Sequence, residues 1–430
     1  MNVAVIGGGY AGMAAAVTLA EQRVPVTVFE AGKSLGGRAR RIEHEEATLD
    51  NGLHILVGAY VETLRLMELV GADPRQSLLR LPFTWKMHRQ FSFTAAALPA
   101  PLHLVAGLLR ARGISFNERV DIARFLLDMR RAGYRLSRDT SVARLLDQAR
   151  QGAAAVRLLW KPLCVSALNT PPAAASAQVF LNVLRDSLNA GRKESDFLLP
   201  RVDLTALFPG PAGEWVTGRG GTVLTGQRVT AVEADAGGYA VRHAAGTAAH
   251  SHVICAVAPH QVKALLARVP ALTDLAQSME RFAYQPIYSV YLQYPAEVRL
   301  PAGMLGFDSA LLQWAFDRGA LCGQAGLIGL VISAEGVHEE HAHEELAQLA
   351  HQELQQQTGP LPQPRWFQVI AERRATFACV PGLVRPANRT PFPDFHLAGD
   401  YTASDYPATI ESAVRSGIAA ARLVLERRPG

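Results

Sequence analysis

The sequence predicts an α/β protein in which a Rossmann-like, dinucleotide-binding domain is interrupted by an inserted domain of mixed α+β structure. Three observations predict this fold class. A glycine-rich turn at residues 7–12 follows the first apolar run, the second apolar run ends in an acidic residue, and another glycine turn at residues 399–400 precedes a final helical segment. Because more than 380 residues separate the two turns, a shared site requires the chain to leave the first domain and return to it.

The first glycine turn lies in the strand, turn and helix context that a phosphate-binding motif needs. The apolar run NVAVI is typical of a strand, and the pattern Gly-x-Gly-x-x-Gly follows it directly, before the helical segment MAAAVTLAEQ. The first glycine permits the tight turn, the second lets the backbone approach a pyrophosphate, and the third lets helix and strand pack closely. The helix N-terminus offers N–H groups and a positive dipole end to the phosphates. We therefore expect cofactor contacts from Gly7, Gly9, Tyr10, Ala11 and Gly12.

The second apolar run, VPVTVFE, ends in an acidic residue at the spacing that a dinucleotide-binding domain uses. Glu30 lies where a carboxylate accepts hydrogen bonds from the adenosine ribose, and Ala31 follows it. The segment LGGRARR then adds Gly36, Gly37 and Arg38, which have no role in a plain NAD-binding domain. Backbone amides and a guanidinium at this point suit a diphosphate held by the first turn. They favour a longer, more enclosed cofactor; the alternative is a glycine loop with a solvated arginine.

The acidic strand end and the Gly-Gly-Arg turn together resemble the flavin-dependent amine oxidase and phytoene desaturase superfamily. This resemblance implies a glutathione-reductase-type domain that binds FAD, with Arg38 beside the FAD phosphates. It also implies that the segment LDNGLHIL, which contains Asp50 and His54, runs towards the flavin ring. By its sequence context alone, His54 is equally well a structural histidine.

The middle of the chain supplies further strands. Residues 220–246 alternate apolar and polar side chains with glycine breaks, which is typical of antiparallel strands. The continuous apolar run HVICAVAP, at residues 252–259, is typical of a buried strand. The superfamily resemblance places the backbone of Val229 against the adenine; without it, Val229 is a core residue.

The second glycine turn ends the apolar segment FHLAGD. Gly399 permits close approach of a ligand, and the carboxylate of Asp400 can accept hydrogen bonds from sugar or ribityl hydroxyls. The superfamily resemblance gives Asp400 this ribityl role. A helix is predicted from near Thr409, and its positive end would stabilise negative charge on a reduced flavin ring. The expected cofactor contacts here are Ala408, Thr409 and Ile410, the alternative being a purely structural final helix.

These motifs divide the chain into two discontinuous domains. The FAD-binding domain is predicted at residues 1–80, 201–262 and 371–430, and the substrate-binding domain at residues 81–200 and 263–370. The first insertion reads as mainly helical, in NERVDIARFLLDMRRAGYRL and SVARLLDQ, and the second contains the strand-like runs QPIYSVYLQYP and GLIGLVIS. Together they would form a mixed cover over the flavin.

Several segments resemble one branch of the superfamily more closely. LWKPLCVSALNTPP, PLHLVAGLLRARGIS, QWAFDRG and AGDYTASDYPATIESAVRSG are similar to the squalene-associated branch, the hydroxysqualene dehydroxylases of bacterial hopanoid pathways. The resemblance extends over nearly the whole chain. It implies that the hydroxyl of an allylic alcohol is protonated and leaves as water, and that hydride from reduced FAD quenches the allylic cation to give squalene.

That reaction needs an apolar tunnel, exclusion of water and one proton donor. The sequence does not single out the donor, and the candidates are the polar groups in motifs expected near the flavin, namely Asp50, His54, Asp405 and Tyr406. Three other functions stay open: a carotenoid- or squalene-type desaturase with the opposite hydride flow, an amine oxidase, and a non-catalytic scaffold that retains FAD. A single GxGxxG motif predicts no NADPH site, so the reductant, such as NAD(P)H, would act from outside.

Composition limits the partners and the location. The four cysteines form no CxxC pair, which indicates neither a disulfide framework nor a metal site and fits a reducing cytoplasm. The net charge of +5 comes largely from arginines after residue 109, with no nucleic-acid recognition motif beside them. These arginines follow the apolar stretch 91–109, which favours peripheral contact with an anionic membrane; the alternative is an ordinary solvated helix face. No membrane-spanning segment or export signal is predicted.

Overall fold

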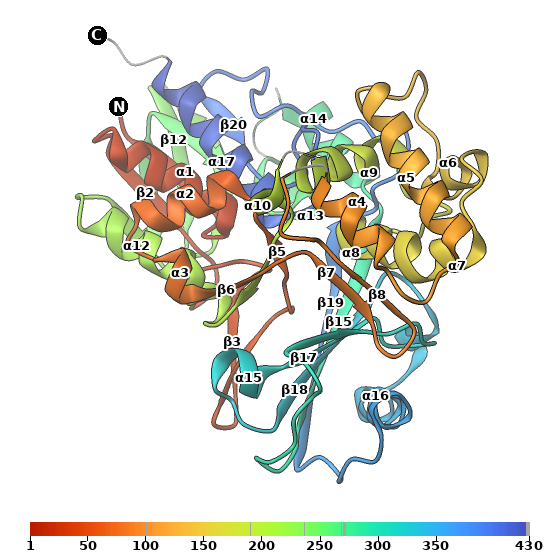
Figure 1. The fold of residues 1–430 in the computed structure, drawn as a ribbon. Helices are drawn as coiled ribbons and strands as arrows, with labels where there is room; N and C mark the ends of the chain where they lie inside the picture. Colours follow the sequence, from red (N-terminus) through yellow and green to blue (C-terminus); the bar gives the residue numbers. More distant parts are fainter. Residues whose placement is uncertain (100–101, 190, 236, 268, 270–271, 427–430) are drawn as a thin grey trace.

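The computed structural model describes residues 1–99, 102–189, 191–235, 237–267, 269 and 272–426. Within these residues a five-stranded parallel sheet forms the core of the nucleotide-binding part (Figure 1). Its spatial order is β10 (Thr222–Leu224), β2 (Val26–Phe29), β1 (Val3–Ile6), β14 (His252–Cys255) and β20 (Phe395–Leu397). β1 and β14 are buried along their whole length, as expected for parallel strands that helices and further strands cover on both faces. The predicted α/β class is confirmed.

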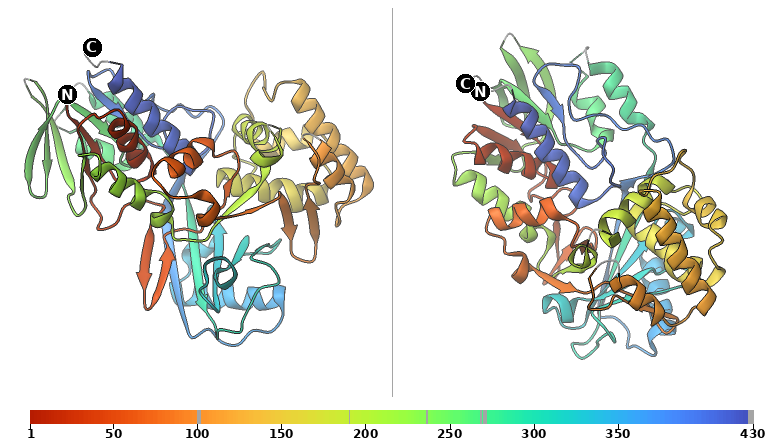
Figure 2. Two further views of the ribbon diagram at one scale, coloured as in Figure 1. Left: turned by 60° about the vertical axis from the view of Figure 1, so that its left-hand side comes forward. Right: turned by 45° about the horizontal axis from the view of Figure 1, so that its top comes forward.

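Two helices from opposite ends of the chain pack side by side on this sheet (Figures 1 and 2). Helix α1 (Tyr10–Glu21) follows β1 and buries eleven of its twelve residues, and α17 (Ile410–Leu425) follows β20. Their backbones come so close that a Cβ atom on Gly417 would collide with the carbonyl oxygen of Ala11. The strand, turn and helix predicted at each glycine turn are therefore present, and they are neighbours in space.

The prediction of antiparallel strands at residues 220–246 is confirmed for only part of this segment. β11 (Val229–Asp235), β12 (Gly238–His243) and β13 (Gly246–His250) form an antiparallel sheet, as predicted. β10 does not join them, because it pairs in parallel with β2, from Thr222 opposite Thr27 to Leu224 opposite Phe29.

A seven-stranded mixed sheet lies below the nucleotide-binding part in Figure 1. Its order is β19 (Trp366–Phe377), β15 (Tyr284–Gln293), β18 (Leu327–Ser333), β17 (Trp314–Asp317), β16 (Met304–Gly306), β7 (Thr84–Met87) and β8 (Phe91–Thr94). The strand predictions for QPIYSVYLQYP and GLIGLVIS are confirmed. Along β18, Ile328, Leu330 and Ile332 pack in a core with helix α16 (His343–Thr358), whereas Val331 and Ser333 line a cavity on the other face.

The helical part of the insertion stands beside this sheet (Figure 2). The predicted helices are confirmed as α5 (Phe116–Arg131) and α6 (Val142–Gln148), and α5 begins with a capping box between Ser115 and Glu118. The other helices are α4 (Leu102–Leu109), α7 (Ala153–Ala155), α8 (Lys161–Leu168) and α9 (Ala177–Leu184), with π-helical turns η1 (Val156–Trp160) and η2 (Arg185–Asn189).

Smaller elements join these parts. β5 (Leu56–Val57), β9 (Phe197–Pro200) and β6 (Leu78–Leu81) form a three-stranded sheet, and β3 (Arg41–His44) forms a hairpin with β4 (Ala47–Asp50). The remaining helices are α2 (Val61–Leu69), α3 (Pro74–Ser77), α10 (Arg192–Ser195), α11 (Leu204–Leu207), α12 (Pro209–Thr217), α13 (Pro259–Leu265), α14 (Thr273–Ser278), η4 (Met279–Arg281), α15 (Arg318–Cys322) and η5 (Val337–Glu340). None of the described helices is long and apolar enough to cross a bilayer.

Candidate cofactor and substrate site

A cavity of about 770 Å³ runs from the glycine turns to the seven-stranded sheet. Its size lies towards the upper end of the roughly 300–1,000 Å³ that ligand pockets occupy. One end is formed by the turns after β1, β2 and β20, and the other by apolar side chains of the insertion. The carboxyl ends of parallel strands, where α/β sheets bind ligands, thus open directly into a second chamber.

Gly7, Gly9 and Gly12 of the first turn differ in how much space a Cβ atom would have at each position. Gly7 has φ +107°, and a Cβ there would lie 2.8 Å from the carbonyl oxygen of Ala256. A Cβ on Gly12 would collide with the carbonyl oxygen of Gly7, so Gly12 serves helix–strand packing and does not line the cavity. Around Gly9, by contrast, no atom lies closer than 3.8 Å to a Cβ, and this side of the turn faces the cavity. The space beside Gly9 is therefore available to a ligand.

The Gly-Gly-Arg turn packs directly against the first turn. The N–H of Gly36 donates to the carbonyl oxygen of Gly8 over 2.9 Å, and Gly9 and Gly36 form an isolated parallel bridge. Gly36 and Gly37 have φ of +119° and +61°, conformations that glycine adopts at low cost. The two turns therefore make one continuous backbone surface, as the prediction of a more enclosed cofactor requires.

Glu30 lies at the end of β2 and lines the cavity beside this surface. Its carboxylate accepts hydrogen bonds from the N–H of Gly8 over 2.7 Å and from the N–H of Gly32 over 2.6 Å. Each carboxylate oxygen keeps further lone pairs for a donor such as a ribose hydroxyl. Ala31 also lines the cavity here, and Val229 lies on the same wall.

The second glycine turn meets the Gly-Gly-Arg turn through an ion pair. Arg38 Nη2 lies 2.7 Å from Asp400 Oδ1, and Arg38 Nη1 donates to the carbonyl oxygen of Ala375 over 2.6 Å. Gly399 has φ +156°, and a Cβ there would collide with the ring of Tyr401. Arg38, Gly399 and Asp400 all line the cavity, so the pair closes a ring of turns around one space.

The N-terminus of α17 forms the next part of the wall. Thr409 is the N-cap and accepts a hydrogen bond from the N–H of Ser412 over 3.1 Å, while Ala408 and Ile410 line the cavity with it. Glu411 is buried, and its carboxylate accepts three hydrogen bonds from α2: from the N–H of Glu62 and from the N–H and hydroxyl of Thr63. Glu411 therefore anchors the helix and leaves its N-terminal end open towards the cavity.

The side chains around this end fit a dinucleotide. Tyr401 lines the cavity, and its buried hydroxyl has no hydrogen-bond partner among the described residues, which is costly unless a ligand supplies one. Burial raises the pKa of Tyr401 well above its ordinary value, so the hydroxyl keeps its proton. Four arginines provide positive charge for a diphosphate: Arg38, Arg40, Arg228 and Arg374. The residues present therefore fit FAD.

The far end of the cavity is apolar and aromatic. Trp85 and Trp314 meet edge to face with ring centroids 5.0 Å apart, and their indole N–H groups donate to Leu158 O and Ser166 Oγ. Because both N–H groups are satisfied, the rings present hydrocarbon to the cavity. The remaining apolar lining is Leu53, Ile55, Val57, Phe83, Leu163, Val165, Ala167, Val183, Ile287, Phe316 and Val331.

The four candidate proton donors fall into two groups. Asp50 does not line the cavity: it is buried, pairs with Arg318 over 2.8 Å and accepts the N–H of Leu204. Asp405 does not line it either, since its side chain is 67% exposed and faces Arg185. His54 and Tyr406 do line it.

His54 and Tyr406 differ in what they can donate. His54 Nδ1 lies 2.8 Å from the carbonyl oxygen of Gly52, so this nitrogen carries the proton, and burial lowers the pKa of the ring. A neutral His54 therefore presents only the acceptor Nε2 to the cavity. Tyr406 retains a hydroxyl proton, because burial raises its pKa and the negative charge of the nearby Asp186 on η2 raises it further.

The structure thus brings together most residues predicted from sequence. Those that line the cavity are Gly7, Gly9, Tyr10, Ala11, Glu30, Ala31, Gly37, Arg38, His54, Val229, Gly399, Asp400, Tyr406, Ala408, Thr409 and Ile410. Sequence reasoning missed Asp186, Arg374, Tyr401 and the two tryptophans. Only Tyr401 carried a signal, since it directly follows the Gly-Asp pair.

Comparison with known proteins agrees with this geometry. The family described as flavin containing amine oxidoreductase matches residues 10–425. Hydroxysqualene dehydroxylases of Rhodopseudomonas palustris and Sinorhizobium fredii are 29% and 26% identical, each covering 99% of this chain and 98% of the relative. A 15-cis-phytoene desaturase of Solanum lycopersicum is 24% identical and covers 99% of this chain and 78% of the relative.

Solved structures share the fold. An oxidoreductase from Methanosarcina mazei matches with a TM-score of 0.76 at 15% identity, over 99% of this chain and 100% of that one. The cyclohexylamine oxidase of Brevibacterium oxydans matches with a TM-score of 0.70 at 18% identity, over 99% and 98%. The superfamily inferred from the motifs and its FAD cofactor are confirmed. With its family matched over nearly its full length and a cavity that fits the cofactor, this chain belongs to the flavin-containing amine oxidoreductases.

Proposed function

We propose that this oxidoreductase converts hydroxysqualene reductively to squalene. The observation that carries the proposal is one continuous cavity. The glycine turns that fit a dinucleotide line one end of it, and apolar and aromatic side chains line the other. The relatives named hydroxysqualene dehydroxylase are 29% and 26% identical to this chain, whereas the desaturases of Solanum lycopersicum and Synechocystis are 24% and 23% identical. This difference supports hydroxysqualene over a carotenoid as the substrate class.

The chemistry asks three things of the chain. When bound and reduced, FAD supplies a hydride. The chain must hold the allylic C–O bond of the substrate beside the cofactor, deliver one proton to the departing oxygen so that it leaves as water, and keep other water away from the allylic carbon. Trp85, Trp314 and Phe316 provide an apolar wall, and the quadrupoles of these rings favour a nearby cation.

We assign proton delivery to the pair Tyr406 and Asp186. Tyr406 lies on the loop before α17, Asp186 lies on η2, and both line the cavity. Asp186 is fixed by Arg185, whose Nε and Nη2 donate to its two oxygens over 2.6 and 3.0 Å. In this assignment Tyr406 donates its proton to the substrate hydroxyl, and Asp186 hydrogen-bonds the tyrosine and connects it to solvent for reprotonation. Asp50 stabilises the fold, since its charge is paired with Arg318.

The proton pair is tested with matched variants. Tyr406→Phe and Asp186→Asn should lower kcat by about 10²- to 10⁴-fold, the usual contribution of a positioned acid, with flavin content unchanged. Asp405→Asn is the control, because Asp405 also faces Arg185 but lies outside the cavity. Full activity of both cavity variants would remove the pair from the mechanism.

The reaction itself is tested anaerobically. The purified protein, reduced chemically, is incubated with hydroxysqualene, and squalene is measured by mass spectrometry. Consumption of squalene or phytoene with an electron acceptor, without squalene formation, would make the protein a desaturase. Hydrogen peroxide release with a polyamine would make it an amine oxidase, and a flavin that no substrate reoxidises would make it a scaffold.

Partners and domain limits complete the proposal. The reductant comes from outside the chain, NAD(P)H or a carrier that it reduces, because the sequence holds one GxGxxG turn. The enzyme works in the cytoplasm, peripherally at an anionic membrane that dissolves its substrate.

Residues 1–80, 201–262 and 371–430 are assigned to the FAD-binding domain and the rest to the substrate domain. All five parallel strands support this division, but β19 continues to Phe377, so a last boundary after Phe377 fits the sheet better.

A further inference from the structure

Large apolar side chains on the surface are concentrated in one segment. Among the described residues, exposed large hydrophobic side chains between 98 and 127 are Leu98, Leu102, Val105, Leu109, Phe116, Val120 and Leu127. Outside this segment they are Met1, Val61, Val337 and Val384, which are scattered along the chain. Single exposed apolar residues are normal, but a cluster of this kind marks an interaction site.

The exposed residues follow one face of each of two neighbouring helices. On α4 the spacing 102, 105 and 109 puts the exposed side chains on one stripe, and Leu104 and Leu108 are buried on another. On α5 the spacing 116, 120 and 127 gives a second exposed stripe, while Ile122 and Phe125 are buried. Helices α4 and α5 contact each other, and Val105 and Leu127, one from each stripe, line the same cavity, so the two stripes lie side by side.

The same surface is basic. Residues 110–139 contain eight arginines and four acidic residues, a formal net charge of +4, against +5 for the whole chain. Arg124 and Arg131 pair with Asp121 and Asp128, whereas Arg110 and Arg112 make no ion pair with any described residue. Apolar stripes beside unpaired arginines match the interface of an anionic bilayer. The apolar side chains can enter the hydrocarbon interior, and the negatively charged headgroups attract the arginines.

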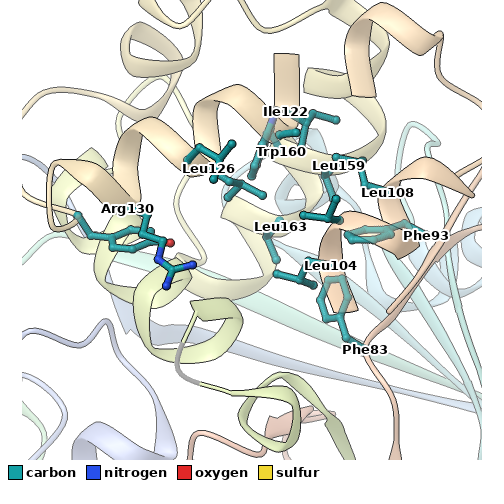
Figure 3. Close-up of a pocket in the computed structure, with 14 residues that line it drawn as sticks. Phe83, Phe93, Leu104, Leu108, Ile122, Leu126, Arg130, Leu159, Trp160 and Leu163 are labelled. Atoms are coloured by element: carbon teal, nitrogen blue, oxygen red, sulfur yellow. The ribbon is translucent and has the colours of Figure 1, made fainter. Parts of the chain in front are cut away.

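A second cavity connects this surface with the interior. It holds about 70 Å³ between α4 and α5, and Figure 3 shows Leu104, Leu108, Ile122 and Leu126 pointing towards one another around it. Val105 and Leu127, which line it, are 40% and 45% exposed. Phe83 and Leu163 line both this side cavity and the main cavity. The side cavity therefore lies between the exposed apolar surface and the substrate chamber, and Phe83 and Leu163 form the wall that it shares with that chamber.

We propose that the α4–α5 surface docks on an anionic lipid bilayer and that a long apolar chain passes from the bilayer between α4 and α5, past Phe83 and Leu163, into the main cavity. That the chain is an isoprenoid alcohol rests on the proposed function; the docking surface and the route do not. A route of this kind spares the substrate any transit through water, which for a thirty-carbon hydrocarbon is the costly step.

The passage must widen when it is used. At about 70 Å³ it is smaller than the 150 Å³ cavity that admits one benzene molecule. Helix α4 is held close to β8, because a Cβ on Gly107 would collide with the carbonyl oxygen of Thr94. Widening therefore falls to the α5 side, where Ala123 and Leu126 line the passage and are only partly buried.

Docking is tested by flotation of the FAD-loaded protein with vesicles of phosphatidylglycerol or phosphatidylcholine. The triple variant Leu102→Ser/Leu109→Ser/Phe116→Ser should bind phosphatidylglycerol vesicles at least tenfold more weakly, and Arg110→Gln/Arg112→Gln should lower the preference for phosphatidylglycerol. Val337→Ser/Val384→Ser removes exposed apolar residues elsewhere and should change nothing. Unchanged binding by the triple variant would overturn the proposal. So would a wild-type dimer that the triple variant abolishes, because the surface would then bind a second copy.

The route is tested with a brominated squalene dissolved in the vesicles, whose bromine quenches tryptophan fluorescence. In a Trp160→Phe/Trp215→Phe/Trp366→Phe background, quenching reports arrival beside Trp85 and Trp314 in the main cavity. Ala123→Phe fills the passage and should slow quenching at least tenfold with the final amplitude and vesicle binding unchanged. Ala143→Phe, which adds the same ring at an exposed position of α6 outside both the passage and the docking surface, should not slow it. If Ala123→Phe melts early, Ala123→Leu replaces it. Equal rates in filled and control variants would overturn the route.

The two proposals fail separately. Uptake of the brominated chain that is slowed by Ala123→Phe, in a protein that makes no squalene from hydroxysqualene, would keep the route and reject the proposed reaction. Squalene formation with uptake indifferent to Ala123→Phe would keep the reaction and reject the route.

Discussion

Arg38 Nη2 and Asp400 Oδ1 lie 2.7 Å apart although 362 positions separate the two residues. One belongs to the Gly-Gly-Arg turn after β2 and the other to the glycine turn after β20. The pair is only partly buried, with 37% of the Arg38 side chain exposed, so its direct contribution to stability is small, roughly 0–1 kcal/mol. Its importance lies in position, because it holds together two turns that line the same cofactor cavity.

Replacing Asp400 with asparagine should therefore affect cofactor binding more than folding. The variant loses a charged acceptor, which we expect to weaken FAD binding by about 10- to 100-fold, in line with the roughly 1.5–3 kcal/mol of a charged hydrogen bond. The flavin-to-protein absorbance ratio after gel filtration measures the change. Arg389→Gln breaks an exposed ion pair with Glu426 outside the cavity and is the control. Equal flavin retention by both variants would contradict the assigned role.

Gly9→Ala should abolish flavin binding without unfolding the protein. The backbone at Gly9 has φ −74°, which alanine adopts easily, and the new Cβ meets no protein atom within 3.8 Å but enters the cofactor space. Gly237→Ala is the matched control, since its Cβ also meets nothing within 4 Å and lies outside the cavity. Both variants should melt within about 2 °C of the wild-type apoprotein. Only Gly9→Ala should fail to take up added FAD. Normal uptake by this variant would contradict the assignment of the space beside Gly9 to the cofactor.

Arg318→Met should be strongly destabilising. Arg318 and Asp50 are 5% and 3% exposed, and removing the arginine leaves a buried carboxylate without its counter-charge. Losing one partner of such a pair costs about 3–5 kcal/mol. Urea unfolding measures the decrease in the free energy of unfolding. Adding Asp50→Asn should recover part of this decrease, because it removes the unpaired carboxylate charge. A loss below 1 kcal/mol would show that the pair is not important for stability.

Stability should decrease in mildly acidic solution. Burial lowers the pKa of His103, His250, His338 and His351, so the folded chain keeps them neutral while the unfolded chain binds protons near pH 6.5. Their contribution is thus complete above pH 6.5 and is lost as the pH falls below it, by up to about 1.4 kcal/mol per pH unit for each group. Denaturant midpoints between pH 8 and 5 measure the slope.

His103 offers a direct check of this pH dependence. It is fully buried on α4, and both ring nitrogens lack a partner among the described residues. His103→Leu should therefore cost little at pH 8 and should make the decline below pH 6.5 shallower. A slope identical to that of the wild type would mean that His103 binds protons equally in the folded and unfolded states, so that its pKa does not change on folding.

Local motifs made the cofactor half of the fold predictable. Glycine turns, an acidic strand end and a helix cap each depend on residues within about ten positions, so NVAVI and the cap at Thr409 could be placed from sequence. The run Thr222–Leu224 was misassigned because a strand of only three residues does not reveal its partner strand. The order of the seven-stranded sheet likewise depends on pairings such as β7 with β16, more than 200 residues apart.

The chemistry of the site was harder to predict for the same reason. Asp50 sits in a motif that leads towards the flavin, but its partner Arg318 lies 268 positions away and makes it structural. Asp186 faces the cavity from a π-helical turn, which adds a residue to the turn and shifts the faces expected from a 3.6-residue period. Tyr401 is recognisable as a ligand contact only once its hydroxyl is seen to be unpaired.

The packing of α1 against α17 has a consequence for biosynthesis. The helix that begins at Tyr10 is made 400 residues before its neighbour, which begins at Ile410. At roughly 5–20 residues per second, the ribosome takes on the order of 20–80 s to deliver the second helix after the first. During that interval the apolar surface of α1 lacks its native partner. A message truncated before Asp400 would yield a chain without this residue and α17, so retention of yellow flavin reports that synthesis continued through α17.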